Sequence, residues 1–144
     1  MAKKDTVRLL HECDAGADMA IHAIDASVRT VPNREMRRIL RDCRLHHMFL
    51  RAQIASLLAE AGDDGKVLPS AVRAMAWIRI KWRLLFSPTS HTAAELLIRG
   101  CRMGEESLGR YLEQYPAASE EAKEVAGDLI RSEVQLEEHL RRFL

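Results

Sequence analysis

Apolar residues recur at spacings of three and four along most of the chain, which is the period of a packed α-helix. A first stretch covers residues 5–30, and its apolar or small positions are Leu10, Cys13, Ala17, Ile21, Ile24 and Val28. A second covers residues 33–61, with Met36, Ile39, Leu40, Cys43, Leu50, Ile54 and Leu57 on its stripe. The period returns over residues 91–115 and 119–144. The pattern therefore predicts an all-α protein.

Helix-breaking and capping residues divide these stretches into two hairpins, 5–62 and 91–144. Pro32 separates the first two helices, and Asn33 is a suitable N-cap for the second. Ser119 is a suitable N-cap for the last helix. Two helical hairpins joined by a long connection are typical of ferritin-like bundles, and the length of 144 residues suits one domain, 1–144.

The connection between the hairpins is too long for an ordinary bundle loop. Its own helix is predicted over residues 69–86 and would rise roughly 25 Å at 1.5 Å per residue. Such a helix can cross the bundle from one end to the other. We therefore expect a ferritin-like four-helix bundle with a long crossover that contains a fifth helix.

The crossover segment is basic and has apolar residues on two helical faces. No acidic residue occurs between residues 65 and 94. A helix that is apolar on two sides needs two partners, so one face would cover the bundle. The other face, with Trp77, Ile80 and Leu84, would meet a protein partner, and a homodimer or other self-association is the expectation. The alternative is attachment to a membrane surface, since basic residues with Trp suit that interface.

Charge and cysteine content restrict the class of protein further. The net charge of +1 gives no general attraction to nucleic acid or acidic membranes. The three cysteines have no Cys-x-x-Cys spacing, which favours reduced thiols in a cytoplasmic protein over a disulfide scaffold. The charged N-terminal residues predict no signal peptide, and no apolar run is long enough to span a bilayer.

Three polar residues near the middles of their helices fall on or beside the apolar stripes: His47, Glu105 and Glu133. In a bundle of similar helices they would meet in one central layer, to which the first helix contributes only Ala17. Inward carboxylates and imidazoles form di-iron and di-manganese sites, but a complete site needs Glu-x-x-His motifs, and none occurs here. Two interpretations stay open: a structural His–Glu hydrogen-bonded layer, or a reduced site for iron, manganese or zinc.

The first helix carries a ladder of His11, Asp14, Asp18, His22 and Asp25 at helical spacing. The ladder lies to one side of the apolar stripe, so most of it is expected to face solvent or a partner. Asp14 is nearest the core and is the fourth candidate metal ligand.

The second helix is rich in arginine and the last helix in glutamate. Because no aromatic residues interleave with the arginines, charge complementarity within or between subunits is favoured over nucleic-acid binding. Cys43 lies one turn before His47 and could be a nucleophile, but its inward position favours an inert buried thiol. Gly100 and Gly104 are expected to let helices approach closely.

The chain also contains a repeated motif, Cys-x-x-Gly, at Cys13 and Gly16 and again at Cys101 and Gly104. The second copy lies within Glu95-Leu96-Leu97-Ile98-Arg99-Gly100-Cys101-Arg102-Met103-Gly104-Glu105-Glu106, followed by Tyr111 and His139, and the crossover carries Trp77 and Trp82. With these motifs the chain resembles a bacterial ferritin-like family known as domain of unknown function 2383. It departs from that family at Ala17, where a Glu is usual, and at His47, where an Arg is usual. The resemblance implies a ferritin-like bundle and self-association, without an established activity.

These observations predict a non-enzymatic binding or assembly protein, with no catalytic residues and no cofactor. The alternative is a metal-binding protein that handles metal or oxidative stress through His47, Glu105, Glu133 and Asp14.

Overall fold

The computed structural model describes residues 2–63, 79 and 89–144. Four long helices form the described part of the chain: α1 (Ala2–Thr30), α2 (Arg34–Glu60), α4 (Ser90–Gln114) and α5 (Glu120–Leu140). A short 3₁₀ turn, Arg141–Phe143, follows α5. The all-α prediction is confirmed, and each of these helices agrees with a predicted stretch to within a few residues. The predicted crossover helix over 69–86, with its partner face of Trp77, Ile80 and Leu84, lies outside the described residues.

Side-chain caps fix where three of the helices begin. The side chain of Asn33 accepts a hydrogen bond from the Met36 amide, and Thr89 and Ser119 cap α4 and α5 in the same way. Each cap satisfies one of the amides that a helix start leaves without a partner. The capping roles predicted for Asn33 and Ser119 are therefore confirmed.

A glycine ends α2. Gly62 has a φ of 77°, which L side chains rarely adopt, and its amide bonds the Ala59 carbonyl at 3.0 Å. The Asp63 amide bonds the Leu58 carbonyl at 2.9 Å, which completes a Schellman termination.

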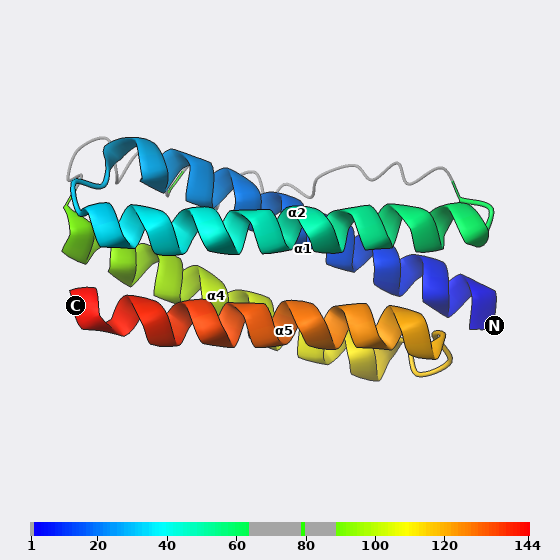
Figure 1. Ribbon diagram of the computed structural model, residues 1–144. Helices are drawn as coiled ribbons and strands as arrows, with labels where there is room; N and C mark the ends of the chain where they lie inside the picture. Colours follow the sequence, from blue (N-terminus) through cyan, green and yellow to red (C-terminus); the bar gives the residue numbers. More distant parts are fainter. Residues whose placement is uncertain (1, 64–78, 80–88) are drawn as a thin grey trace.

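The four helices lie side by side along one long axis (Figure 1). Helix α1 packs on α2, α4 on α5, α2 on α5, and α1 on α4. Helix α2 ends at the opposite end of the bundle from the start of α4, so these two helices run in the same direction (Figure 1). None of the described helices is sufficiently long and apolar to cross a membrane.

The apolar core is divided into two clusters, one in each half of the bundle. The first gathers around Ile24, Leu40 and Leu136, and the second around Leu10, Leu50 and Leu129. On α2, His47 falls between Leu40 and Leu50. A polar layer therefore separates the two apolar halves of the core.

Candidate functional site

The centre of this polar layer is a contact between His47 of α2 and Glu133 of α5. His47 is fully buried and Glu133 is 9% exposed. The protonated imidazole donates from Nε2 to Glu133 Oε1 at 3.0 Å and from Nδ1 to the Cys43 carbonyl at 2.9 Å. Both ring nitrogens therefore have an acceptor, which is what a buried polar side chain requires.

These hydrogen bonds fix the charge of the ring. Burial lowers the pKa of His47, but the side-chain hydrogen bonds with Cys43 and Glu133, followed by the charges of Cys43 and Glu133, outweigh burial and raise the pKa to about 10. At neutral pH the layer holds an imidazolium paired with a carboxylate. Such a pair is costly to bury but also costly to break, because one partner alone leaves an uncompensated charge.

Two of the three free cysteines flank this layer. Cys43 Sγ lies 3.4 Å from His47 Nδ1 and 4.0 Å from Ser132 Oγ. Burial first, and the nearby Glu133 carboxylate next, raise the pKa of Cys101 far above its ordinary value. In the second apolar cluster, burial and then Glu12 and Asp14 raise the pKa of Cys13 to about 12. Cys13 and Cys101 are therefore neutral thiols, which are poor nucleophiles and poor metal ligands.

Glu105, the third residue of the predicted layer, is half-buried, and no hydrogen bond joins it to His47 among the described residues. Its Oε1 atom is buried and has no hydrogen-bond partner in the described part of the chain. Burial, followed by the charges of Glu137 and Glu133, raises the pKa of Glu105. The layer thus contains one paired carboxylate and a second one nearby that is incompletely satisfied.

A cavity of about 460 Å³ opens between α1 and α4, and Glu133 forms part of its lining. Small residues line much of the rest, including Ala17 and Gly100. A Cβ atom added at Gly104 would meet Glu133 at 3.6 Å, whereas one added at Gly100 would meet nothing within 4 Å among the described residues. Among the described helices, the expected close approach is therefore not found at Gly100, which lines the cavity.

As they stand, the candidate ligands do not form a metal-coordinating set. Both ring nitrogens of His47 form hydrogen bonds, one with Glu133 Oε1 and one with the Cys43 carbonyl, so neither nitrogen is available to a metal ion. Within residues 2–63, 79 and 89–144, no group of three or more His, Cys, Asp or Glu side chains is placed to hold an ion. The present geometry of the layer is a hydrogen-bonded network.

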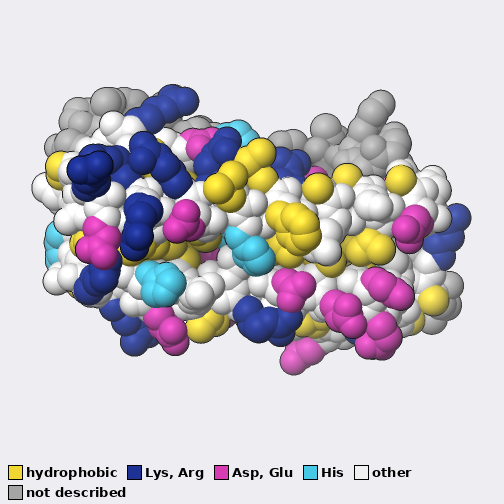
Figure 2. All heavy atoms as spheres, in the orientation of Figure 1, with side chains coloured by type: hydrophobic (Ala, Val, Ile, Leu, Met, Phe, Trp, Pro, Cys, Tyr) yellow, Lys and Arg dark blue, Asp and Glu magenta, His cyan; other side chains and the backbone are white. Residues whose placement is uncertain are grey.

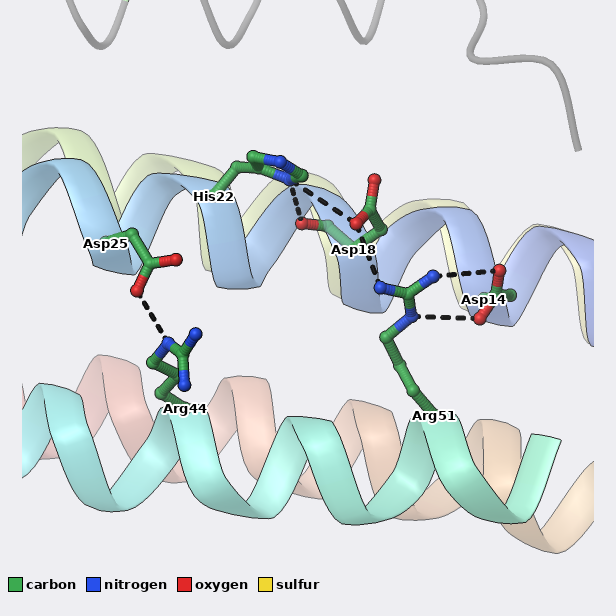
Figure 3. Close-up of polar contacts among 6 residues, drawn as sticks. All are labelled: Asp14, Asp18, His22, Asp25, Arg44 and Arg51. Atoms are coloured by element: carbon green, nitrogen blue, oxygen red, sulfur yellow. Dashed lines mark hydrogen bonds and ion pairs between the residues drawn. The ribbon is translucent and has the colours of Figure 1, made fainter. Parts of the chain in front are cut away.

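Asp14, the fourth candidate ligand, belongs to a separate set of ion pairs between α1 and α2 (Figure 3). Arg51 Nε lies 3.0 Å from Asp14 Oδ1, and Arg51 Nη1 lies 3.0 Å from Asp18 Oδ1. Arg44 Nε lies 2.6 Å from Asp25 Oδ1, and this pair forms one end of the row of ion pairs along α1 and α2. The three aspartates of the ladder predicted to face solvent or a partner thus form ion pairs with arginines of the neighbouring helix, whereas His11 lies 2.9 Å from Asp63 and His22 lies 3.4 Å from Asp18 of its own helix.

Glu137, which is buried in α5, is not among the residues predicted from the sequence. Its carboxylate accepts hydrogen bonds from Arg102 Nε at 2.8 Å and from Arg141 Nη2 at 3.1 Å. Glu137 lies four residues after Glu133, so the same helical spacing could have indicated it.

A second feature of functional interest is on the outer surface of α2. Leu45 is 64% exposed, Phe49 60% and Met48 45%, in the middle of a long helix. Figure 2 shows a row of hydrophobic side chains over α2, with basic side chains gathered at one end of this face and acidic ones towards the other. This outer stripe is additional to the apolar stripe of α2 that packs into the bundle, and it was not predicted from the sequence.

Comparisons with family models, with curated proteins and with solved structures find no match to this chain.

Proposed function

We propose that this protein is a non-enzymatic binding and assembly module that associates with other copies of itself through the outer face of α2. The observation that carries this proposal is the exposure of Leu45, Met48 and Phe49 side by side on one helix. Exposed apolar residues that gather in one place are typical of interaction sites, whereas scattered ones are ordinary.

The chemistry of the interior supports a structural role for the polar groups. His47 has a partner at each nitrogen, and Cys13 and Cys101 are protonated thiols. A general base or a nucleophile needs an accessible group with a pKa near the working pH. The three free cysteines also support our proposal of a reducing, cytoplasmic location.

We further propose that the bundle is ferritin-like and related to the bacterial domain of unknown function 2383. Supporting this are the parallel course of α2 and α4 and the placement of the connected ends at opposite ends of the bundle (Figure 1). The Cys-x-x-Gly motifs at Cys13 and Cys101 lie on α1 and α4, the first helices of the two hairpins.

Sedimentation velocity of the full chain, measured from low to high micromolar concentration, tests the assembly proposal. We expect a species larger than the monomer that dissociates on dilution. The double substitution Leu45→Ser and Met48→Ser should shift the protein to monomer. The substitution Val134→Ser is the control, because Val134 is 37% exposed on α5, and it should leave the size unchanged. A wild-type protein that stays monomeric at high micromolar concentration would contradict the proposal.

The second candidate function is metal binding, and Glu105 is the observation that favours it. Its buried Oε1 atom lacks a hydrogen-bond partner among the described residues, as a carboxylate prepared for a cation would. Elemental mass spectrometry on tag-free protein, after anaerobic loading with Fe(II), Mn(II) or Zn(II), tests this function. Near-stoichiometric metal that is lost with Glu105→Ala and kept with His11→Ala would support it. Metal at background level would exclude it.

A further inference from the structure

Two of the exposed apolar residues of α2, Leu45 and Met48, belong to a longer row on the outer face of that helix, and Phe49 lies beside this row. Exposed residues follow one another at alternating steps of four and three, and they are Arg34, Arg38, Arg41, Leu45, Met48, Ala52, Ala55 and Ala59. We call this row the outward ridge of α2. One step of four and one of three together make a repeat of seven residues, which is the repeat by which one helix packs along another in a coiled coil.

The outward ridge changes character along its length. Its first third consists of three arginines, its middle of Leu45 and Met48, and its last third of three alanines. One end of the ridge therefore carries large charged side chains, and the other end carries only methyl groups. A partner for this ridge has to be small and uncharged opposite the arginines and large opposite the alanines.

A second copy of the same helix, placed antiparallel, meets this requirement along the whole ridge. With a two-fold axis between residues 46 and 47, Leu45 lies opposite Met48 of the second copy. Each arginine then lies opposite an alanine: Arg41 faces Ala52, Arg38 faces Ala55 and Arg34 faces Ala59 of the second copy. An alanine leaves room for the aliphatic stem of an arginine, which can cover apolar surface while its charged end stays in water.

Other pairings lack this match. A parallel pair in register would place each arginine against itself and each alanine against itself, with repulsion at one end and empty space at the other. An anionic membrane would attract the arginine end but would gain less at the opposite end, where the exposed Glu60, Glu120, Glu121 and Glu124 oppose the attraction of Lys3 and Lys4 (Figure 1).

The charges at the bundle ends favour the same antiparallel arrangement. Helix α2 ends and α5 begins at one end of the bundle (Figure 1), and the four glutamates outnumber the exposed Lys3 and Lys4 of α1 there. Figure 2 shows basic and acidic side chains gathered towards opposite ends of this face. Antiparallel pairing brings the arginine end of each copy over the acidic end of the other.

We infer that two copies of this chain form an antiparallel dimer through the outward ridge of α2, with each arginine of the ridge packed over an alanine of the other copy. This inference rests on the proposed assembly function and specifies its partner and its register.

Charge substitutions at Ala52 test the register, because this residue is exposed and should face Arg41 of the second copy. Ala52→Arg should raise the dissociation constant of the dimer about tenfold, and Ala52→Glu should lower it, since two symmetric contacts are changed together. The combination Arg41→Glu with Ala52→Arg should restore the dissociation constant to near the wild-type value. Sedimentation velocity gives the constants, and circular dichroism checks that each variant keeps its helix content.

The outcomes separate this inference from the function on which it rests. A wild-type dimer that Ala52→Glu and Ala52→Arg weaken equally, with no restoration by the exchanged pair, would overturn the antiparallel register and leave the assembly function intact. A wild-type monomer would overturn both. A wild-type monomer that also co-floats with phosphatidylserine vesicles would overturn both in favour of membrane attachment.

Discussion

The helix period predicts that His47 points into the core, but only the complete fold shows which groups form hydrogen bonds with it there. The period puts it at the centre of an apolar stripe, between Cys43 and Leu50, and the structure buries it fully. A buried imidazole without partners would be strongly destabilising. The contact with Glu133 at 3.0 Å and the Cys43 carbonyl at 2.9 Å satisfy both nitrogens. The interior thus tolerates this polar residue because two helices supply its acceptors.

The first prediction concerns the mutual dependence of His47 and Glu133. His47→Leu keeps roughly the volume of the side chain but removes the partner of a buried carboxylate, so it should lower the free energy of unfolding by about 3 kcal/mol. The double substitution His47→Leu and Glu133→Leu should recover most of this loss, because a buried ion pair replaced by apolar residues is often neutral. Urea unfolding of both variants and the wild type gives the values. Equal losses in the single and double variants would contradict the pairing.

The second prediction is a fall in stability as the pH rises. The folded-state pKa of His47 is about 10 and its ordinary value is 6.5, so the folded protein binds the extra proton between these values. The stabilisation is fully present below pH 6.5 and is lost as the pH approaches 10. Between about pH 7 and about pH 8.5 the free energy of unfolding should fall by about 2 kcal/mol.

The control for this experiment is the variant with leucine at both positions 47 and 133, which should show only a small fall in the same range. Thiols of the unfolded chain begin to ionise near the top of this range, so Cys13 and Cys101, whose pKa values are raised in the folded protein, add a smaller fall of the same sign that the double variant shares. A wild-type profile as flat as that of the double variant would show that His47 is not protonated in the folded protein.

At the scale of secondary-structure elements, ion pairs at the side of the bundle align α1 with α2. Arg51 bridges Asp14 and Asp18, which are one turn apart, and Arg44 binds Asp25 two turns further along (Figure 3). Each of these two arginines of α2 lies level with its aspartate partners along the axis of α1. A shift of one helix along the other by a turn would therefore exchange or break these contacts. The pairs therefore help to set the register of the first hairpin, while burial of its apolar stripes supplies most of the stability.

The third prediction follows from this row of ion pairs. Arg51→Met keeps an unbranched side chain but removes the cation between two aspartates, so unfolding should become easier by about 1 kcal/mol at low salt. The loss should shrink in high salt because these partly exposed pairs are screened. Arg99→Met, at an exposed position on α4, is the matched control and should change stability by less than about 0.5 kcal/mol. Equal effects of the two substitutions would show that the row contributes nothing specific.

At the scale of the whole molecule, each face of a helix has a different task. The inner stripes of the four helices form two apolar half-cores with the polar layer between them. The sides carry ion pairs such as that between Arg51 and Asp14. The outward ridge of α2 has neither role, which is why we assign assembly to it. Self-association through α2 differs from the sequence prediction of a partner at Trp77, Ile80 and Leu84, a surface outside the described residues.

By itself, the sequence determined the parts of this protein that depend on local rules. The spacing of apolar residues predicted the four helices, Asn33 and Ser119 marked where two of them begin, and the period placed His47 inside. These features follow from neighbouring residues on one helix, so no knowledge of the other helices is needed.

Only the tertiary structure decided which polar residues meet. The sequence placed Glu105 and Glu133 in one layer, but only Glu133 binds His47, and Asp14 binds Arg51 on another side of α1. The choice depends on the rotation and height of each helix relative to its neighbours, where a change of one residue turns a side chain by roughly 100°. The rotation and height of each helix are set by the packing of all the apolar stripes together, and the sequence of one stripe does not predict them.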